Sequence, residues 1–226
     1  MIKIENIEVY GWGTAIRGAR NPMNSWDKID TVIGTYWGEI DGHECYDNDG
    51  FTIGKNDYKL LKNLCIAGTD HRKWMRMVNV TMDITGPLYW WKEFDTYKVG
   101  TVANSCSTMH KIHEKEFTLE DFSHEHLFET SRVILLKTIN QLNSYRDLFI
   151  NHEDNTAYDK KSCWWQLIQL LPSSYNQKRT VQLNYEVLNN IYHARKNHKL
   201  DEWHTLCEEI EKLPYSEFIT MNFKGE

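Results

Sequence analysis

The stretch YWWKEFDTYKVGTVANSCSTMH, residues 89–110, changes character along its length. It begins with aromatic residues at helical spacing and ends in a run of small hydroxyl and thiol side chains: Thr101, Ser105, Cys106, Ser107 and Thr108. Such a run offers little apolar surface to a core, whereas hydroxyl groups hydrogen-bond readily and a thiolate is a strong nucleophile. The run is therefore a candidate ligand-binding loop with Cys106 as its candidate nucleophile. The alternative is an inert cysteine, which is the usual state of a thiol without a nearby base.

Two groups of histidines have spacings that metal ligands use. They are His110 with His113 in HKIHE, and His124 with His126 in HEH. No HExxH signature is present, and the five cysteines form no CxxC pair. We therefore favour locally hydrogen-bonded histidines and predict no metal site.

Tryptophans occur in two adjacent pairs, Trp90-Trp91 and Trp164-Trp165. A flat ligand ring stacks well on such side chains. Aromatic residues at helical spacing also pack in cores and subunit interfaces, and we favour this second interpretation.

The segment QLNYEVLNNIYHARKNH predicts a helix with one face for ligand contacts. Eleven residues at about 100° each place Asn184 and Arg195 on one side, about 16 Å apart. An arginine there can hold a carboxylate or phosphate with two parallel hydrogen bonds. A solvent-exposed arginine is the alternative.

The elements that must position these residues follow from hydrophobic periodicity. In the first half we predict strands over 2–9 and 78–85, helices over 56–68 and 87–98, and an irregular excursion over 20–56. In the second half we predict helices over 125–150, 158–171, 179–198 and 200–212. This pattern indicates one α+β domain spanning residues 1–226, with strands in the first half and helices in the second.

Composition limits the partners and the compartment. A net charge of −6 argues against a dedicated nucleic-acid surface. No apolar run approaches the roughly 20 residues that cross a bilayer, so we expect no membrane partner. The scattered, odd number of cysteines favours a reducing, cytoplasmic setting.

Two distant blocks resemble one family. Residues 81–112, TMDITGPLYWWKEFDTYKVGTVANSCSTMHKI, resemble the strand, helix and loop of the flavin-dependent thymidylate synthases (ThyX), which end in Arg-His-Arg-x-x-Ser-x-x-x-x-Ser-x-Arg. LPSSYNQKRTVQLNYEVLNNIYHAR resembles the family's Leu-Pro stretch and the helix after it, and AIRGAR, AGTDHRKW and LPYSEF resemble weaker elements. The resemblance covers most of the chain and implies the ThyX fold.

The signature itself is rewritten. Thr96, Tyr97 and Lys98 stand at the Arg-His-Arg positions, Thr101 and Cys106 at the serines, and Thr108 at the final arginine. Another family arginine corresponds to Ile168. Neutral donors thus occupy places where the family has arginines, and each lost charge-assisted hydrogen bond removes roughly 1.5–3 kcal/mol from phosphate binding. Candidate replacement cations are Lys98, Arg72, Lys73, Arg76 and Lys178.

The resemblance implies a site and its ligands. A pyrimidine nucleotide would contact Arg195, Thr96, Lys98, Thr101, Ser105, Ser107 and Thr108. A flavin would contact His71, Lys73, Arg76, Asn184 and Asn190. The family reaction methylates dUMP to dTMP with FAD, NADPH and methylenetetrahydrofolate, and its members form homotetramers.

Two functions remain open at this point. The first is a divergent thymidylate synthase-like enzyme that uses FAD. The second is a non-catalytic nucleotide- or flavin-binding protein on the same scaffold.

Overall fold

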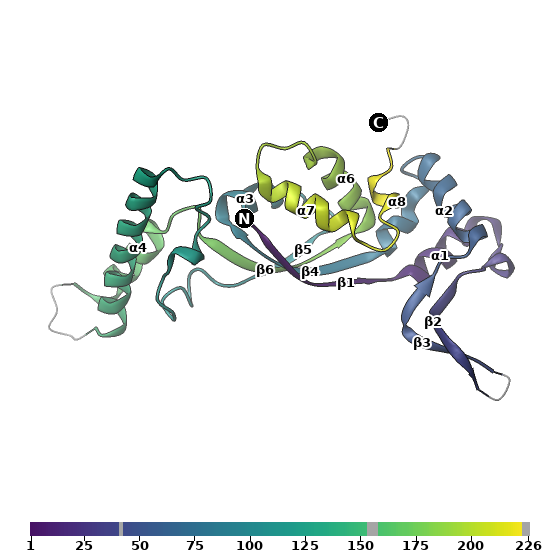
Figure 1. Ribbon diagram of the computed structural model, residues 1–226, viewed down its shortest axis with the longest axis horizontal. Helices are drawn as coiled ribbons and strands as arrows, with labels where there is room; N and C mark the ends of the chain where they lie inside the picture. The colour runs from purple at the N-terminus through teal and green to yellow at the C-terminus, as the bar shows by residue number, and fades with distance from the viewer. Residues whose placement is uncertain (41–42, 153–157, 223–226) are drawn as a thin grey trace.

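The computed structural model describes residues 1–40, 43–152 and 158–222, with the side chains of 35–40 and 43–50 outside that description. It has the predicted α+β fold, in which a four-stranded sheet lies under a layer of helices (Figure 1). Cys45 lies among the residues whose side chains are not described. None of the described helices has the length and apolarity needed to cross a membrane.

The sheet is antiparallel and has the strand order β1-β4-β6-β5. Its strands are β1 Lys3–Tyr10, β4 Asn79–Pro87, β6 Asn176–Asn184 and β5 Val102–Ser105. The alternation predicted over 78–85 is confirmed in β4, whose Val80, Met82 and Ile84 are at most 2% exposed. These side chains form one apolar face, and the polar residues between them form the other.

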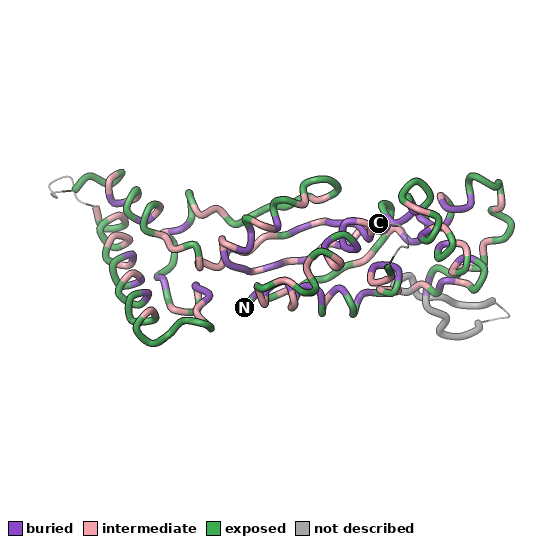
Figure 2. Tube along the Cα trace, turned by 90° about the horizontal axis from the view of Figure 1, so that it is seen from above, coloured by how far each residue is buried: buried purple, intermediate pink, exposed green. Residues whose placement is uncertain are grey.

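Helices cover the apolar face. They are α3 Leu88–Phe94, α6 Tyr185–Arg195, α7 Asp201–Glu211 and α8 Glu217–Thr220. Figure 1 shows α6, α7 and α8 together on this side, and Figure 2 shows the buried positions concentrated where they meet the strands. The main core lies between these layers, with Trp90, Leu188 and Trp203 all completely buried.

The predicted helix over 179–198 is wrong in its first third. Residues 176–184 form β6, and α6 begins only at Tyr185. Strand β6 lies between β4 and β5 and bonds to both, so tertiary pairing overrides the weak helical propensity of QKRTVQLN. The C-terminal half therefore contributes a central strand as well as helices.

The irregular excursion predicted over 20–56 is also wrong in part. It contains short 3₁₀ turns, η1 Asn21–Met23 and η2 Trp26–Lys28, and a hairpin of β2 Val32–Ile40 with β3 His43–Thr52. Helices α1 Trp12–Arg20 and α2 Lys55–Ile66 flank this segment, and η3 Arg72–Met77 leads into β4. Together they form one end of the molecule (Figure 1).

A smaller core lies at the other end. It involves the 3₁₀ turn η4 Leu119–Asp121 and the helices α4 Glu129–Ile150 and α5 Lys160–Leu170. The two ends make the molecule long (Figure 1). Its accessible surface is 13757 Å², against about 10,800 Å² expected from the mass of a compact monomer.

Candidate functional site

Helix α3 and the turn after it carry the rewritten motif. The helix follows directly on Pro87, whose fixed φ suits a helix start. The turn ends at Gly100, which has φ +74° and lies against α6. A Cβ there would stand 2.8 Å from Asn184 Nδ2, so glycine allows the turn to approach the first residues of α6.

The predicted anion anchor, Arg195, is held by groups from three elements. Its Nε donates to the Tyr97 hydroxyl at 2.9 Å, and its Nη1 donates to Glu93 Oε2 at 3.1 Å. Its guanidinium lies 4.8 Å from the Trp203 ring centre. Trp203 Nε1 also donates to Glu93 Oε2, at 2.9 Å, and His198 Nε2 lies 3.4 Å from the same oxygen. The arginine is therefore oriented, and its charge is offset by Glu93.

A second arginine, Arg179, lies beside the rewritten loop. Its Nη1 donates to Asp95 Oδ1 at 2.7 Å, its Nε donates to Gln177 Oε1 at 3.0 Å, and its guanidinium lies 4.3 Å from the Trp91 ring centre. Sequence reasoning did not single out this residue. It faces the helices because side chains alternate along β6. This alternation identifies Arg179 only if residues 176–184 are taken as a strand and not as a helix.

Three of the proposed replacement cations, Lys178, Arg76 and Arg72, pair with carboxylates away from the rewritten loop. Lys178 lies 3.0 Å from Asp83 Oδ2 on the polar face of the sheet, opposite to Arg179. The Asp83 hydrogen bond raises the pKa of Lys178. Arg76 hydrogen-bonds to Glu186, and the Nε of buried Arg72 lies 3.6 Å from the same carboxylate. Only Lys98 among the candidates lies on the rewritten loop.

The hydroxyl-rich run borders a small pocket. The pocket has a volume of about 260 Å³ and is lined by Phe94, Asp95, Tyr97, Lys98, Thr101 and Ala103. Thr101 Oγ1 is buried, and no described residue hydrogen-bonds to it. A buried hydroxyl without a partner is costly, so this group is suited to a polar ligand.

Several other residues of this region form hydrogen bonds within the protein instead of facing the pocket. Ser105 is the last residue of β5, and the Cys106 backbone N–H extends the ladder by donating to β6 at 2.9 Å. Ser107 Oγ accepts from two backbone N–H groups that follow it, and the Thr96 hydroxyl donates to a carbonyl of α3 at 2.7 Å. Thr108 is half-buried. The thiol-bearing Cys106 is exposed to solvent.

The predicted flavin contacts fall into different settings. Asn184 is the N-cap of α6, where its Oδ1 accepts from a backbone N–H at 3.0 Å. Asn190, His71 and Lys73 are exposed. The neighbouring Asn189, which sequence reasoning passed over, is 2% exposed and holds the chain near α8 through the carbonyl of residue 219 at 2.5 Å.

Three of the four histidines in the two groups make contacts within the protein. His124 Nδ1 bonds to a backbone carbonyl at 2.8 Å, His126 lies 3.0 Å from Asp201, and the His113 ring packs at a tilt against Phe149, with 4.6 Å between the ring centres. Within the described ranges, no group of three or more His, Cys, Asp or Glu side chains could hold a metal ion.

The tryptophan pairs differ in exposure. Trp90 and Trp91 are at most 1% exposed, which rules out both the ligand-stacking and the subunit-interface roles for this pair. Trp164 donates to the carbonyl of Met109 at 3.0 Å, and Trp165 is 41% exposed. Only the second pair has surface left for a contact.

The predicted site therefore separates into two groups. One gathers Arg195, Lys98 and Thr101 around Tyr97 and the small pocket. The other places Asn184 and Arg76 at the first turn of α6. Glu93 bonds to Arg195 within the first group, and Asp95, which lines the same pocket, bonds to Arg179.

Comparison of the sequence with protein-family models and with curated proteins finds no match. Comparison of the fold finds solved structures of similar shape. Thymidylate synthase X from Helicobacter pylori with FAD and dUMP matches with a TM-score of 0.63 and 15% identity, over 99% of this chain and 98% of that one. A flavin-dependent thymidylate synthase from Helicobacter pylori complexed with FAD and dUMP matches with a TM-score of 0.62 and 15% identity, over 96% and 98%. The fold of this chain is thus ThyX-like.

Proposed function

We propose that this chain is a divergent, flavin-linked enzyme of the thymidylate synthase type that acts on a pyrimidine deoxynucleotide. The observation that carries the proposal is the similarity of fold along nearly the whole chain to a protein with FAD and dUMP. The default reaction is the methylation of dUMP to dTMP, with NADPH and methylenetetrahydrofolate as co-substrates. We place this reaction in the cytoplasm and treat residues 1–226 as one working domain.

The residues around the small pocket fit a polar ring. Thr101 Oγ1 is a buried hydroxyl that a ligand would satisfy, and Lys98 and Tyr97 line the same space. Arg195 uses Nε and Nη1 within the protein, so its Nη2 is the nitrogen that would meet a ligand oxygen. When bound, FAD would supply electron-transfer chemistry. Asn184 and Asn190 would hold and orient it, and Arg195 would hold the nucleotide.

The volume of the pocket bears on assembly. About 260 Å³ lies just below the usual range of roughly 300–1,000 Å³ for a small-ligand site. The pocket can hold a group the size of a nucleobase. A dinucleotide such as FAD is larger, so the rest of it would need to contact another surface. The accessible surface of 13757 Å² is larger than a compact monomer requires. We propose a homotetramer whose copies complete one another's sites, and light scattering that gives a strict monomer at micromolar concentration would contradict it.

Absorption spectroscopy tests the proposed function. Purified protein with bound oxidised flavin would be yellow, and titration with dUMP would change the flavin spectrum. A colourless protein that neither takes up added FAD nor binds dUMP would overturn the proposal.

A non-catalytic nucleotide- or flavin-binding role is the second candidate. It is favoured by the pairing of both arginines at the site with carboxylates, Arg195 with Glu93 and Arg179 with Asp95. Such pairs reduce the positive potential available to a phosphate. Binding of dUMP and FAD without NADPH-dependent turnover would favour this role over the enzyme.

Cys106 adds a chemical possibility to the first candidate. Its thiolate would form a bond to an electron-poor carbon of the uracil ring, and the ring would take up a proton. Incubation with a 5-fluorinated deoxyuridine nucleotide tests this step by intact mass. An adduct that survives denaturation and disappears in Cys106→Ser supports the nucleophile. Binding without an adduct leaves Cys106 as a small neighbour of the ligand.

A further inference from the structure

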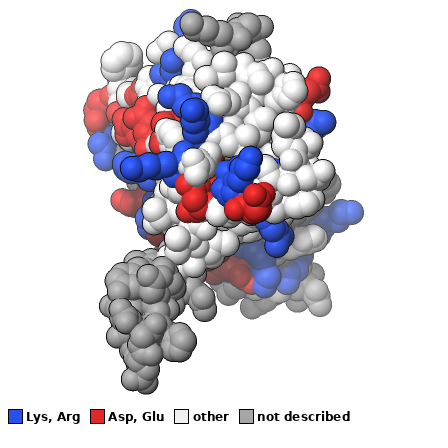
Figure 3. Space-filling model, turned by 90° about the vertical axis from the view of Figure 1, so that its right-hand side faces the viewer, with Lys and Arg blue, Asp and Glu red and all other residues white. Residues whose placement is uncertain are grey.

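A basic cleft lies at the end of the molecule formed by α1, α2 and the η2 turn. It has a volume of about 400 Å³ and is lined by Arg20, Lys28, Asn56, Lys59, Leu60 and Asn63. Figure 3 shows this end, where Lys and Arg side chains lie among Asp and Glu side chains on the surface. Three cations in one cleft are unexpected in a chain with a net charge of −6, so the cleft calls for a physical reason.

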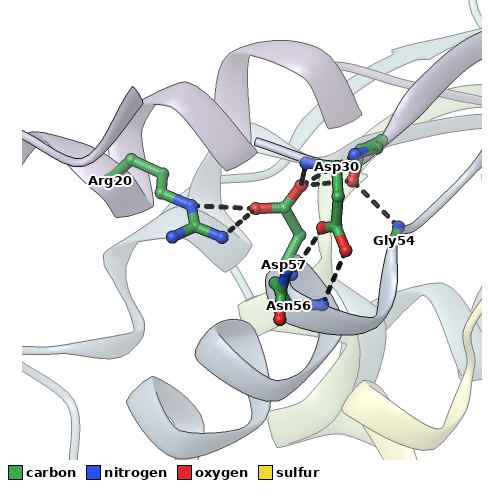
Figure 4. Close-up of polar contacts among 6 residues, drawn as sticks. Arg20, Asp30, Gly54, Asn56 and Asp57 are labelled. Atoms are coloured by element: carbon green, nitrogen blue, oxygen red, sulfur yellow. Dashed lines mark hydrogen bonds and ion pairs between the residues drawn. The ribbon is translucent and has the colours of Figure 1, made fainter. Parts of the chain in front are cut away.

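Arg20 is fixed before any ligand arrives. Its side chain is 6% exposed, and its Nε and Nη2 donate to Asp57 Oδ1 at 2.9 and 2.6 Å. Figure 4 shows the third guanidinium nitrogen, Nη1, without a bond and directed away from Asp57. The cleft therefore contains one rigidly held donor whose orientation costs little entropy on binding.

The carboxylates beside the cleft are already satisfied. Asp57 Oδ2 accepts from the backbone N–H groups of Asp30 and Thr31 and from the Thr31 hydroxyl, at 2.7 to 3.0 Å. Asp30 in turn accepts from the N–H groups of Asn56 and Asp57 at the start of α2, at 2.9 and 3.0 Å. Figure 4 shows this closed network. Among the described residues, no ion pair joins Asp30 or Asp57 to either lysine of the cleft.

Lys28 and Lys59 are exposed, and no ion pair joins either of them to another described side chain. Asn56, Lys59 and Asn63 come from one side of α2, because residues spaced by three, four and seven share a helix face. Their amide groups add neutral donors to the charged ones. Two unpaired ammonium groups and one guanidinium nitrogen match an anion with several linked charged groups better than a single carboxylate.

We propose that this cleft binds a small-molecule oligophosphate, a chain of two or more linked phosphate groups. Lys28 and Lys59 neutralise the charges, Arg20 Nη1 and the amides of Asn56 and Asn63 fix the oxygens, and Leu60 forms the apolar wall. The cleft shares no lining residue with the pocket at α3, so the proposal does not depend on the reaction proposed above.

Isothermal titration with inorganic tripolyphosphate at low salt tests the cleft. We expect saturable binding with one site per chain and an affinity that falls as salt is raised. The double variant Lys28→Gln/Lys59→Gln should weaken binding by about tenfold or more, because it removes both charge-assisted contacts. Both lysines are exposed, so the variant should keep the parent's melting temperature.

The matched control is Lys55→Gln/Lys62→Gln, which removes the same charge from α2 outside the cleft lining. It should weaken binding by about twofold or less. A second arm replaces tripolyphosphate with a nucleoside triphosphate. Equal affinity means that the phosphate chain alone is recognised, and tighter binding means that the nucleoside also contacts the cleft.

Two results would overturn the proposal. One is an absence of saturation at about 5 mM tripolyphosphate. A site that stays mostly empty at that concentration has a binding free energy weaker than about −3 kcal/mol. The other is an equal loss of affinity in the test and control variants, since that would reduce binding to the general positive charge of α2. Unchanged dUMP binding in the test variant keeps this result separate from the function proposed for the α3 pocket.

Discussion

Two arginine–carboxylate pairs in this protein are built differently. Arg20 and Asp57, at the base of the β2–β3 hairpin, are 6% and 0% exposed, and the carboxylate accepts five hydrogen bonds. Arg195 and Glu93, between α6 and α3, are 20% and 36% exposed and are joined by one hydrogen bond at 3.1 Å. The first pair is almost completely buried, with only Arg20 reaching the cleft, and the second is open to solvent.

The difference separates a structural pair from an exchangeable one. Removing one member of a buried pair leaves the other charged and without water. In a half-exposed pair, solvent screens the charge that remains, so the pair contributes little to folding and can yield to a ligand. Burial therefore predicts which variants damage folding and which alter binding.

The largest expected effect comes from Asp57→Ala. It leaves Arg20 buried without its carboxylate and should lower the free energy of unfolding by about 3–5 kcal/mol. Urea denaturation followed by circular dichroism measures the loss. Glu93→Gln is the control, since it removes the charge but keeps an oxygen for the buried indole N–H of Trp203, and it should cost about 1 kcal/mol or less. Equal losses in the two variants would contradict the distinction between the pairs.

Arg195→Ala should act on binding instead. Loss of a charge-assisted contact should weaken binding of a pyrimidine nucleotide by about 2 kcal/mol or more, with the melting temperature nearly unchanged. Calorimetric titration of parent and variant with dUMP gives the difference. Identical affinities would leave Arg195 as a surface residue.

A smaller effect of opposite sign is expected from Glu93→Gln. It removes the charge that offsets Arg195 while keeping an oxygen for the indole N–H of Trp203. Binding of dUMP should tighten, by about 1 kcal/mol or less, because the arginine no longer shares its charge. The same titration measures it, and Asp95→Asn makes the parallel test for Arg179. Weaker binding in Glu93→Gln would mean that the carboxylate orients the arginine more than it competes with the ligand.

The smallest effect concerns a half-buried carboxylate on the polar face of the sheet. Hydrogen bonds from Thr180, Asn6 and Lys178 lower the pKa of Asp83 to about 2, below the value of about 3.9 in an unfolded chain. Its contribution to stability is therefore present above about pH 4 and is lost as the pH falls through about 2. As the pH falls from about 4 to about 2, the melting temperatures of the parent and of Asp83→Asn should converge. A difference in melting temperature that does not change with pH would mean that the stability comes from hydrogen bonds and not from the charge of Asp83.

The sequence predicted elements well where the periodicity was strong and local. The alternation of Val80, Met82 and Ile84 identified β4, and the four helices at 88–94, 129–150, 160–170 and 201–211 lie within their predicted ranges. Strand β6 was missed because Gln177 and Arg179 occupy positions on its helix-facing side, which breaks the apolar alternation. The hairpin over 32–52 was missed because its second strand is rich in Asp, Asn and Gly.

The site was predicted less completely than the fold. Arg195 and Thr101 were identified as candidates, but their partners come from distant parts of the chain. Glu93 precedes Arg195 by 102 residues, and no local pattern connects them. The network that fixes Arg20 was not predicted either, because it depends on how the 30–31 segment folds back on α2.

The place of β6 in the sheet constrains how the chain can fold. Strand β4 is complete at Pro87, but its neighbour β6 ends only at Asn184, and the pair Asn79↔Asn184 closes a loop of more than a hundred residues. Such long-range pairing raises the contact order and slows folding, because the entropy of loop closure is lost before the contacts form. During synthesis, β1 and β4 leave the ribosome first and keep an open edge until β6 follows. The order of the strands therefore delays completion of the sheet until most of the chain has been synthesised.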